Sequence, residues 1–215
     1  MFTTISDAEK AVGGLSSPSK MPSYAWNISA KRCMIGSLLV EVNGSVCNTC
    51  YALKGRYVFP TVQTALERRY IAWLNDRKQW IEAMIYLMHN KGHIVKTGYF
   101  RWFDSGDLQG IEMLKDIIKV ACACPHIKFW LPTKEYKLIR KHSRLKIPDN
   151  LVIRVSNPYV NKATLKGHEY VSTVFTKDRL KESNGNICPS SKQGNKCDKC
   201  RWCWSKIKDI TYIYH

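Results

Sequence analysis

The chain has 215 residues, of which 45% are hydrophobic, and this is enough to bury the core of one domain and excludes a disordered tail. Lys and Arg number 34 against 17 Asp and Glu, so the formal charge is +17 and the sequence pI is about 9.6, which favours an acidic partner such as nucleic acid. No window approaches 18 consecutive apolar residues, and the N-terminus lacks a basic head followed by an apolar run, so we expect a cytoplasmic protein without a membrane span.

The first 90 residues predict an arm, a hairpin and a helical stretch. Residues 1–32 have no sustained apolar period and predict an N-terminal arm. Ser37 to Val42 has the composition of a strand, and Asn43-Gly44 is a typical hairpin turn. Residues 61–90 have helical spacing, with Thr61 as the expected N-cap and Asn75-Asp76 as a break between two helices.

Strand-like and helical runs then alternate. We expect strands near 94–103, 127–132, 151–156 and 170–175, and helices near 108–121 and 134–143. Such alternation predicts an α/β fold with a parallel or mixed sheet, a partial (βα) barrel in a single domain. The link 157–169 is too short for a comfortable crossover helix, so the last unit is expected to be irregular or antiparallel. Within that domain the Cys hairpin region is 33–60, the βα core 61–176 and the Cys-rich C-terminal segment 177–215.

Nine cysteines provide the strongest chemical signal in the chain. Their density is below that of a disulfide scaffold, and in a cytoplasmic protein thiols stay reduced, so two-residue gaps indicate metal ligation or redox chemistry. Cys197, Cys200 and Cys203 form C-x2-C-x2-C, with Cys188 followed by a proline upstream. This spacing suits a [4Fe–4S] cluster better than zinc, which prefers two separated C-x2-C pairs.

The remaining cysteines are less informative. Cys47 and Cys50 form a second C-x2-C with Cys33 fourteen positions earlier, and they fit a second cluster, a shared zinc site, a redox pair or a structural knuckle. Together the two groups supply seven thiolates, enough for one cluster with four ligands and one with three. A four-iron cluster held by three thiolates has one iron without a protein ligand. Cys122 and Cys124 are expected to be buried free thiols, with ligation as the alternative.

Polar residues follow the expected strands. Asp104, Ser105 and Asp107 come directly after one strand, where βα folds build their sites. Asp104 is the candidate catalytic group and Ser105 and Asp107 are candidate cofactor-binding groups, although Asp107 could instead cap the helix 108–121. Thr133, Lys134, Ser156 and Asn157 end other strands and are expected at the same rim, as ligand groups or as loop caps.

Six of the thirteen residues from Lys134 to Lys146 are basic, and nine more basic residues lie close to the C-terminal cysteines. A solvated helix face is the ordinary interpretation. Basic side chains interleaved with aromatic ones also suit single-stranded nucleic acid, and part of this charge would offset an anionic cluster.

Three segments together resemble phage proteins of the gene-product-88-like family: Cys47-Asn-Thr-Cys50-Tyr-Ala-Leu-Lys-Gly-Arg-Tyr, Arg101-Trp-Phe-Asp-Ser-Gly-Asp107, and Cys188-Pro to Cys203-Trp. The likeness extends from about Lys20 to Trp204. It implies a viral protein of the infected host's cytoplasm with these cysteines, and Cys33, as iron–sulfur ligands. A partial barrel with a cluster at its mouth is also similar to radical S-adenosylmethionine enzymes, but their C-x3-C-x2-C loop is missing, so S-adenosylmethionine is an open possibility without support from the motif.

The leading hypothesis is therefore an iron–sulfur protein with one or two clusters, a redox or cluster-dependent role, and a host electron donor. The alternative is a zinc-stapled module that binds nucleic acid without catalysis. A virion or scaffold component is a third possibility.

Overall fold

The computed structural model describes residues 2–214. Its centre is one parallel sheet of seven strands in the order β1-β2-β3-β4-β5-β7-β6, open between the edge strands β1 and β6. The strands are β1 (Ala25–Trp26), β2 (Tyr99–Trp102), β3 (Lys128–Thr133), β4 (Leu151–Val160), β5 (Tyr170–Phe175), β6 (Asn186–Ile187) and β7 (Asp209–Ile213). The expected α/β fold with an unclosed, barrel-like parallel sheet is confirmed.

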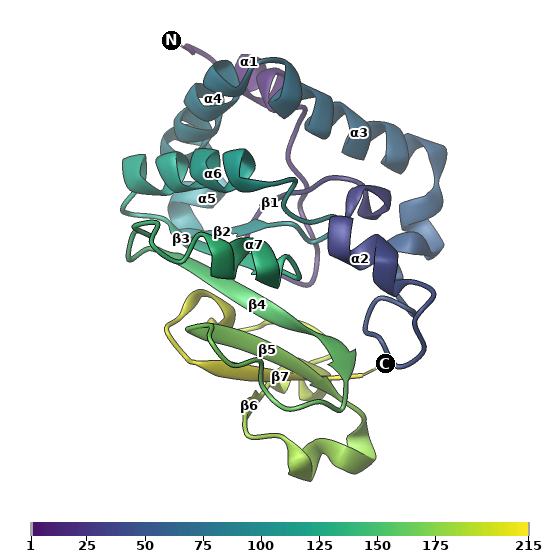
Figure 1. Ribbon diagram of the computed structural model, residues 1–215. Coiled ribbons are helices and arrows are strands. Elements are labelled where there is room, and N and C mark those ends of the chain that lie inside the picture. The colour runs from purple at the N-terminus through teal and green to yellow at the C-terminus, as the bar shows by residue number, and fades with distance from the viewer. Residues whose placement is uncertain (1, 215) are drawn as a thin grey trace.

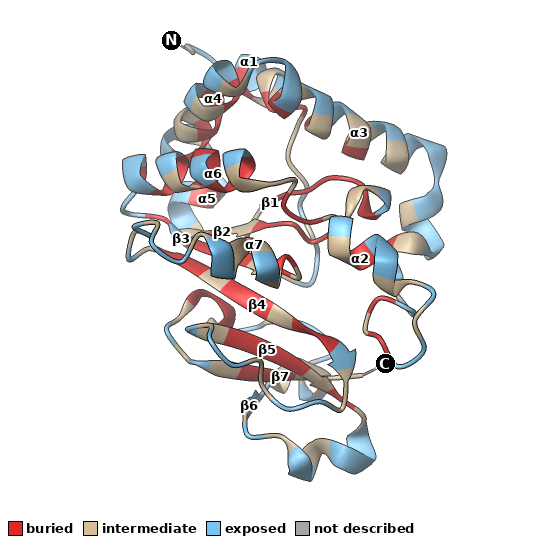
Figure 2. Ribbon diagram, viewed as in Figure 1, coloured by how far each residue is buried: buried red, intermediate tan, exposed pale blue. Residues whose placement is uncertain are grey.

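The described residues 2–214 include seven α-helices: α1 (Ile5–Ala11), α2 (Met34–Leu39), α3 (Pro60–Asn75), α4 (Arg77–Asn90), α5 (Gly92–Thr97), α6 (Ile111–Ala123) and α7 (Tyr136–Lys141). The longer ones gather over the half of the sheet that holds β1 to β3 (Figure 1). Buried residues concentrate on the strands and on the sheet-facing sides of these helices (Figure 2). No helix among residues 2–214 has the length and apolar character needed to span a bilayer.

The two faces of the sheet are covered by different parts of the chain. On β2, Phe100 and Trp102 belong to the large core under the helices, whereas Tyr99 points to the other face. There a second, smaller core forms around Trp130, Cys203 and Trp204. The indole N–H of Trp204 donates to the Phe100 carbonyl at 2.8 Å. The Cys-rich C-terminal segment therefore packs directly on the sheet.

The helical stretch 61–90 is confirmed with its break. Asp76 separates α3 from α4 and caps α4, because its carboxylate accepts from the Gln79 amide at 2.8 Å. Thr61 as the N-cap is wrong, since Phe59 takes that position and Pro60 begins α3. A proline is favoured there because its missing N–H has no helical partner in any case.

The strand predicted at 37–42 is wrong, and with it the hairpin, although the chain does turn at Asn43-Gly44. These residues fall in α2 and the turn after it, and Gly44 takes the left-handed φ of +77° that the turn requires. The carboxylate of Glu135 accepts from the Ile35 amide at 2.9 Å and so satisfies the first turn of α2. A cap supplied from 100 positions away leaves no local signal in the sequence.

Other boundaries also differ from expectation. The first half of the strand expected at 94–103 is α5, which ends at Gly98 with a left-handed φ of +69°. The helix expected at 108–121 begins at Ile111. The N-terminal arm contains α1 and the edge strand β1, and β7 adds a strand that was not expected.

The pairing of β4 with β5 is parallel, so the antiparallel alternative is wrong. The connection between them, residues 161–169, has no helix. Nine extended residues reach up to about 30 Å, whereas a six-residue strand such as β5 is about 20 Å long. An extended link is therefore long enough to return the chain for parallel pairing.

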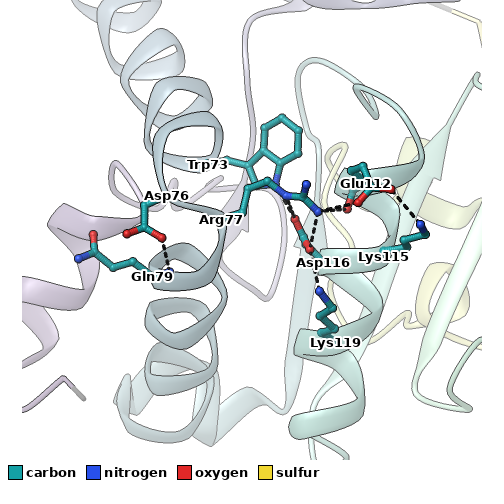
Figure 3. Close-up of polar contacts among 8 residues, drawn as sticks. All are labelled: Trp73, Asp76, Arg77, Gln79, Glu112, Lys115, Asp116 and Lys119. Carbon is teal, nitrogen blue, oxygen red and sulfur yellow. Dashed lines mark hydrogen bonds and ion pairs between the residues drawn. The ribbon is translucent and has the colours of Figure 1, made fainter.

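An ion pair between a buried carboxylate and a partly exposed arginine joins α6 to the junction of α3 and α4 (Figure 3). Asp116, with no exposed surface, accepts from Arg77 Nε at 2.7 Å and from the indole N–H of Trp73 at 3.1 Å. We expect Asp116→Ala to lower the free energy of unfolding by about 3 kcal/mol, because the Trp73 N–H is left buried without an acceptor and Arg77 loses its partner. Urea denaturation measures this loss.

Glu112 provides the matched control, since it contacts the same Arg77 at 3.0 Å but its side chain is half-exposed. Glu112→Ala should cost less than about 1 kcal/mol. Equal losses for the two variants would contradict the importance of the buried partner.

Candidate metal centres

Cys33, Cys47 and Cys50 lie between β1 and α3, close to the carboxyl ends of the strands. A Cβ placed on Gly36 of α2 would lie 3.5 Å from Cys33 Sγ and 3.7 Å from Cys47 Sγ, so these two sulfurs are at most about 7 Å apart. The same Cβ would clash with Cys33 Cβ at 2.8 Å. Glycine therefore leaves open a space between two thiols that any larger residue would fill. We call these three residues the rim cysteines.

Burial raises the pKa of the Cys33 thiol, and Asp107, Cys50 and Cys47 act in the same direction. Burial also raises the pKa of Cys47, against the opposing effect of Lys134. All three rim cysteines therefore lie within electrostatic reach of one another. Their thiolates would be stabilised by a bound cation.

Asp107 lies beside the rim cysteines and is held by three donors. Its carboxylate accepts from the Leu108 amide at 2.8 Å, the Thr133 hydroxyl at 2.6 Å and the Lys134 amide at 2.7 Å. Asp107 does not cap α6, whose N-cap is Gly110, so the helix-capping alternative is wrong. Burial raises the pKa of Asp107, and the same holds for Glu135 nearby. The prediction that Thr133 and Lys134 gather with Asp107 at one rim is confirmed.

Asp104 and Ser105 occupy the same loop but face β1. The Asp104 carboxylate accepts from the side-chain amide of Asn27, and the backbone carbonyl of Asp104 accepts from the Tyr51 hydroxyl. The Ser105 hydroxyl donates to the Ile28 carbonyl at 2.9 Å. Ser105 thus fixes the loop against the strand, while Asp104 borders a cavity described below.

Ser156 and Asn157 do not end a strand as expected, since β4 continues past them to Val160, and both are used structurally. Ser156 pairs with the Ser172 hydroxyl at 3.2 Å on the neighbouring strand. Asn157 donates to the Ala163 carbonyl at 2.7 Å and accepts from the Tyr159 amide at 2.9 Å. The loop-capping alternative therefore describes Asn157.

The other four cysteines of the expected ligand set lie on the face of the sheet opposite the helices, and we call them the inner-face cysteines: Cys188, Cys197, Cys200 and Cys203. The Cys197 amide donates to the Lys20 carbonyl at 3.0 Å, which ties this segment to the N-terminal arm. Cys203 Sγ lies 3.1 Å from the Tyr212 hydroxyl. Burial raises the pKa of Cys203 to about 12, and the thiols of Cys188 and Cys197 add to this effect.

Two arginines face the inner-face cysteines, the fully buried Arg154 and the partly buried Arg101, and neither forms a salt bridge with a carboxylate among the described residues. Arg154 has no exposed surface and donates only to backbone carbonyls, including Val171 at 3.0 Å and Ser205 at 3.2 Å. Arg101 stacks on the Trp130 ring at 4.4 Å and donates to the Phe103 carbonyl at 3.2 Å. The Nε of each is buried without an acceptor. Both side chains act electrostatically on Cys203.

Asp209 acts on the charge of Arg154 and Asp104 on that of Arg101, but neither carboxylate is hydrogen-bonded to its arginine, and a buried cation without a contacting counter-ion is costly. The described residues therefore leave room for negative charge at the inner face, and thiolates bound to metal would supply it. Sequence reasoning missed both arginines as parts of the site. The visible signal was a charged residue inside each apolar strand run, YFRW for Arg101 and LVIRV for Arg154.

All nine cysteines are free thiols. Within residues 2–214, no three Cys, His, Asp or Glu side chains are already arranged to hold one metal ion. Four thiolates around a single zinc lie about 3.8 Å apart, given a Zn–S distance of about 2.3 Å. Sulfurs that bind different irons of a cluster are more widely spaced, because the irons lie between them.

Cys122 and Cys124 differ from one another, so the expectation that both are buried is wrong for Cys122, which is exposed. Cys124 has no exposed surface, and burial raises its pKa to about 12. We expect iodoacetamide at pH 8 to alkylate Cys122 within minutes and to leave Cys124 unmodified until the protein unfolds. Peptide mass spectrometry distinguishes the two sites, and equal labelling of the folded protein would contradict this burial.

The fold and these residues define a class: an open parallel α/β sheet with three cysteines at its rim and four on its inner face. Comparison with known families places the chain more closely. The family model described as Gene product 88 matches residues 20–206, and the chain belongs to this family of phage proteins. No curated protein and no solved structure matches the chain.

Proposed function

We propose that this phage protein binds two iron–sulfur clusters, one through the rim cysteines and one through the inner-face cysteines, and that the rim cluster carries out redox or cluster-dependent catalysis. A cluster held by three protein thiolates has one iron that can bind an exogenous ligand, whereas a cluster with four is suited to electron transfer. The observation that carries the proposal is the pair of arginines beside Cys203, Arg154 and Arg101, neither of which has a salt-bridge partner among the described residues. Asp209 and Asp104 act on these charges only from a distance, and thiolates bound to metal would supply negative charge closer to them.

The chain's own residues would have separate roles. Gly36 keeps space open between Cys33 and Cys47. Asp107 fixes the loop after β2 to the end of β3, and so holds the wall of the rim site in place. Arg101 lies near Asp104 in the loop after β2 and near Cys203 of the inner-face cysteines, because both act on its charge. It is therefore placed to offset negative charge from either side.

Purification without oxygen, followed by iron, sulfide and zinc analysis, tests this proposal. We expect iron and acid-labile sulfide in equal amounts, at about eight of each per chain. A colourless protein that contains zinc and no sulfide would overturn it in favour of the zinc-stapled alternative.

Nucleic acid is a second candidate partner, favoured by the exposed basic residues on and after α7. Lys137, Arg140, Lys141, Arg144 and Lys146 are exposed, and none of them forms a salt bridge within the described part of the chain. We expect binding of a single-stranded oligonucleotide to weaken at least tenfold between 50 and 200 mM salt, as contacts to roughly three phosphates would require. Fluorescence anisotropy measures this. An affinity independent of salt, or no binding at 50 mM, would contradict the role.

A further inference from the structure

A cavity of about 330 Å³ lies between the first half of α3 and the carboxyl ends of β1 and β2. This volume is at the small end of the range for ligand sites in proteins. Its polar wall is built from Asn27, Tyr57, Arg69 and Asp104, and its apolar wall from Val62, Ala65 and Leu66 of α3. A lining that is polar on one side and apolar on the other is typical of a binding site for a small molecule with a polar group and an apolar side chain.

The polar wall is a buried network with two opposite charges. Asn27 joins them, because its amide donates to the Asp104 carboxylate while its carbonyl accepts from Arg69 Nη1 at 2.7 Å. All three residues are less than one-tenth exposed. Burial lowers the pKa of Arg69, and the nearby Asp104 carboxylate opposes that effect.

Both charged groups retain hydrogen-bonding capacity. Arg69 uses Nε on the Gly14 carbonyl at 3.0 Å and Nη1 on Asn27, and its Nη2 has no acceptor among residues 2–214. The second oxygen of Asp104 has only the Tyr57 hydroxyl, at a long 3.4 Å. A carboxylate has about four acceptor sites and a guanidinium five donors. The cavity therefore offers a spare anionic acceptor and a spare cationic donor, separated by one amide side chain.

We propose that this cavity binds an α-amino acid or a derivative that keeps the free amino acid head group. The ligand's ammonium would donate to Asp104, its carboxylate would accept from Arg69, and its side chain would pack on Val62, Ala65 and Leu66. Arg56 also lines the cavity but is exposed to solvent, so the buried part of the wall balances its own charge with Arg69 and Asp104. A net-neutral zwitterion therefore adds no uncompensated buried charge. A simple anion or cation would leave one of the two groups without a partner.

The cavity adjoins the rim cysteines. Tyr51 directly follows Cys50 in the chain, and its hydroxyl donates to the Asp104 carbonyl. Tyr51 also packs edge-to-face on Tyr57, which lines the cavity. A bound amino acid would thus lie next to the proposed rim cluster, but its recognition depends only on the protein side chains and not on the presence of iron.

Equilibrium dialysis of the protein purified without oxygen tests the inference with four probes: L-methionine, S-adenosylmethionine, methionine methyl ester and 4-(methylthio)butanoate. The first two have the complete head group, and S-adenosylmethionine adds a sulfonium charge on its side chain. The methyl ester lacks only the carboxylate charge of methionine, and 4-(methylthio)butanoate lacks only its ammonium. We expect saturable binding of methionine or of S-adenosylmethionine, and at least tenfold weaker binding of both truncated analogues. Whichever complete probe binds more tightly identifies the size of the natural ligand.

Variants locate the site. Asp104→Asn and Arg69→Met should each weaken binding at least tenfold. Arg68→Met is the matched control and should leave it unchanged, since Arg68 makes the same kind of bond to the Gly13 carbonyl at 3.1 Å but is exposed and does not line the cavity. Should a variant fail to fold, the analogue series on the wild type still decides the question.

Absence of saturable binding for both complete probes would overturn the inference, as would equal binding of an analogue that lacks a charge. The same dialysis on chelator-treated protein distinguishes it from the proposed function. Binding that survives iron removal supports the cavity even if the iron–sulfur proposal fails.

Discussion

Cys33→Ser and Cys197→Ser are each expected to remove about half of the bound iron and sulfide, and the double variant nearly all of it. The two residues belong to different thiol groups, since Cys33 is acted on by Cys47 and Cys50, and Cys197 by Cys188 and Cys200. Serine is a poor ligand for the irons of a cluster, which prefer soft thiolate sulfur. Anaerobic iron and sulfide analysis, together with electron paramagnetic resonance of the reduced protein, measures the loss from each site.

Cys122→Ser is the matched control, because this exposed thiol is remote in sequence from both groups and should change neither iron nor sulfide content. Three outcomes contradict the two-site arrangement. One is complete loss from either single variant, which would indicate a single shared cluster. The others are no loss from Cys33→Ser, which would make the rim cysteines structural, and loss from the control.

The cysteines of the candidate centres and their grouping as four and three were predictable from the sequence, but the contacts around them were not. The spacing of Cys197, Cys200 and Cys203 gave the inner-face group, since short gaps on one loop carry geometric information. Cys33 is separated from Cys47 by a segment that folds as α2, and the space beside Gly36 exists only in three dimensions. The polar wall of the cavity was not predictable either, because Asn27, Arg69 and Asp104 come from three distant parts of the chain and are joined only in the folded protein.

The fold shows the same limit. Parallel β–α alternation was predictable because β3, β5 and the α3–α4 pair have strong local periods and turn signals. The run SLLVEV was assigned wrongly, since its strand-like composition is overridden by the distant carboxylate that caps α2. Two-residue strands such as β1 have no period to detect, and β1 is held in place by its pairing with β2.

Arg154→Met is expected to lower the reduction potential of the inner-face cluster by about 60 mV or more, which corresponds to about 1.4 kcal/mol for one electron. A fully buried guanidinium without a carboxylate partner favours added negative charge nearby, and reduction adds one electron. A unit charge about 8 Å away, acting through an effective dielectric constant of about 20, contributes about 2 kcal/mol. A redox titration followed by electron paramagnetic resonance measures the shift.

Three further variants separate this charge effect from a structural one. Arg154→Lys keeps the charge while losing most of the carbonyl contacts, so its potential should remain closer to the wild type than that of Arg154→Met. Arg101→Met removes the second arginine charge and should also lower the potential, because Arg101 acts on Cys203 as well. Lys137→Met removes an exposed charge from α7 and should change the potential by only a few millivolts, since solvent and salt screen it. A potential that is unchanged or higher in Arg154→Met would mean that the buried arginine serves only to hold the C-terminal segment on the sheet.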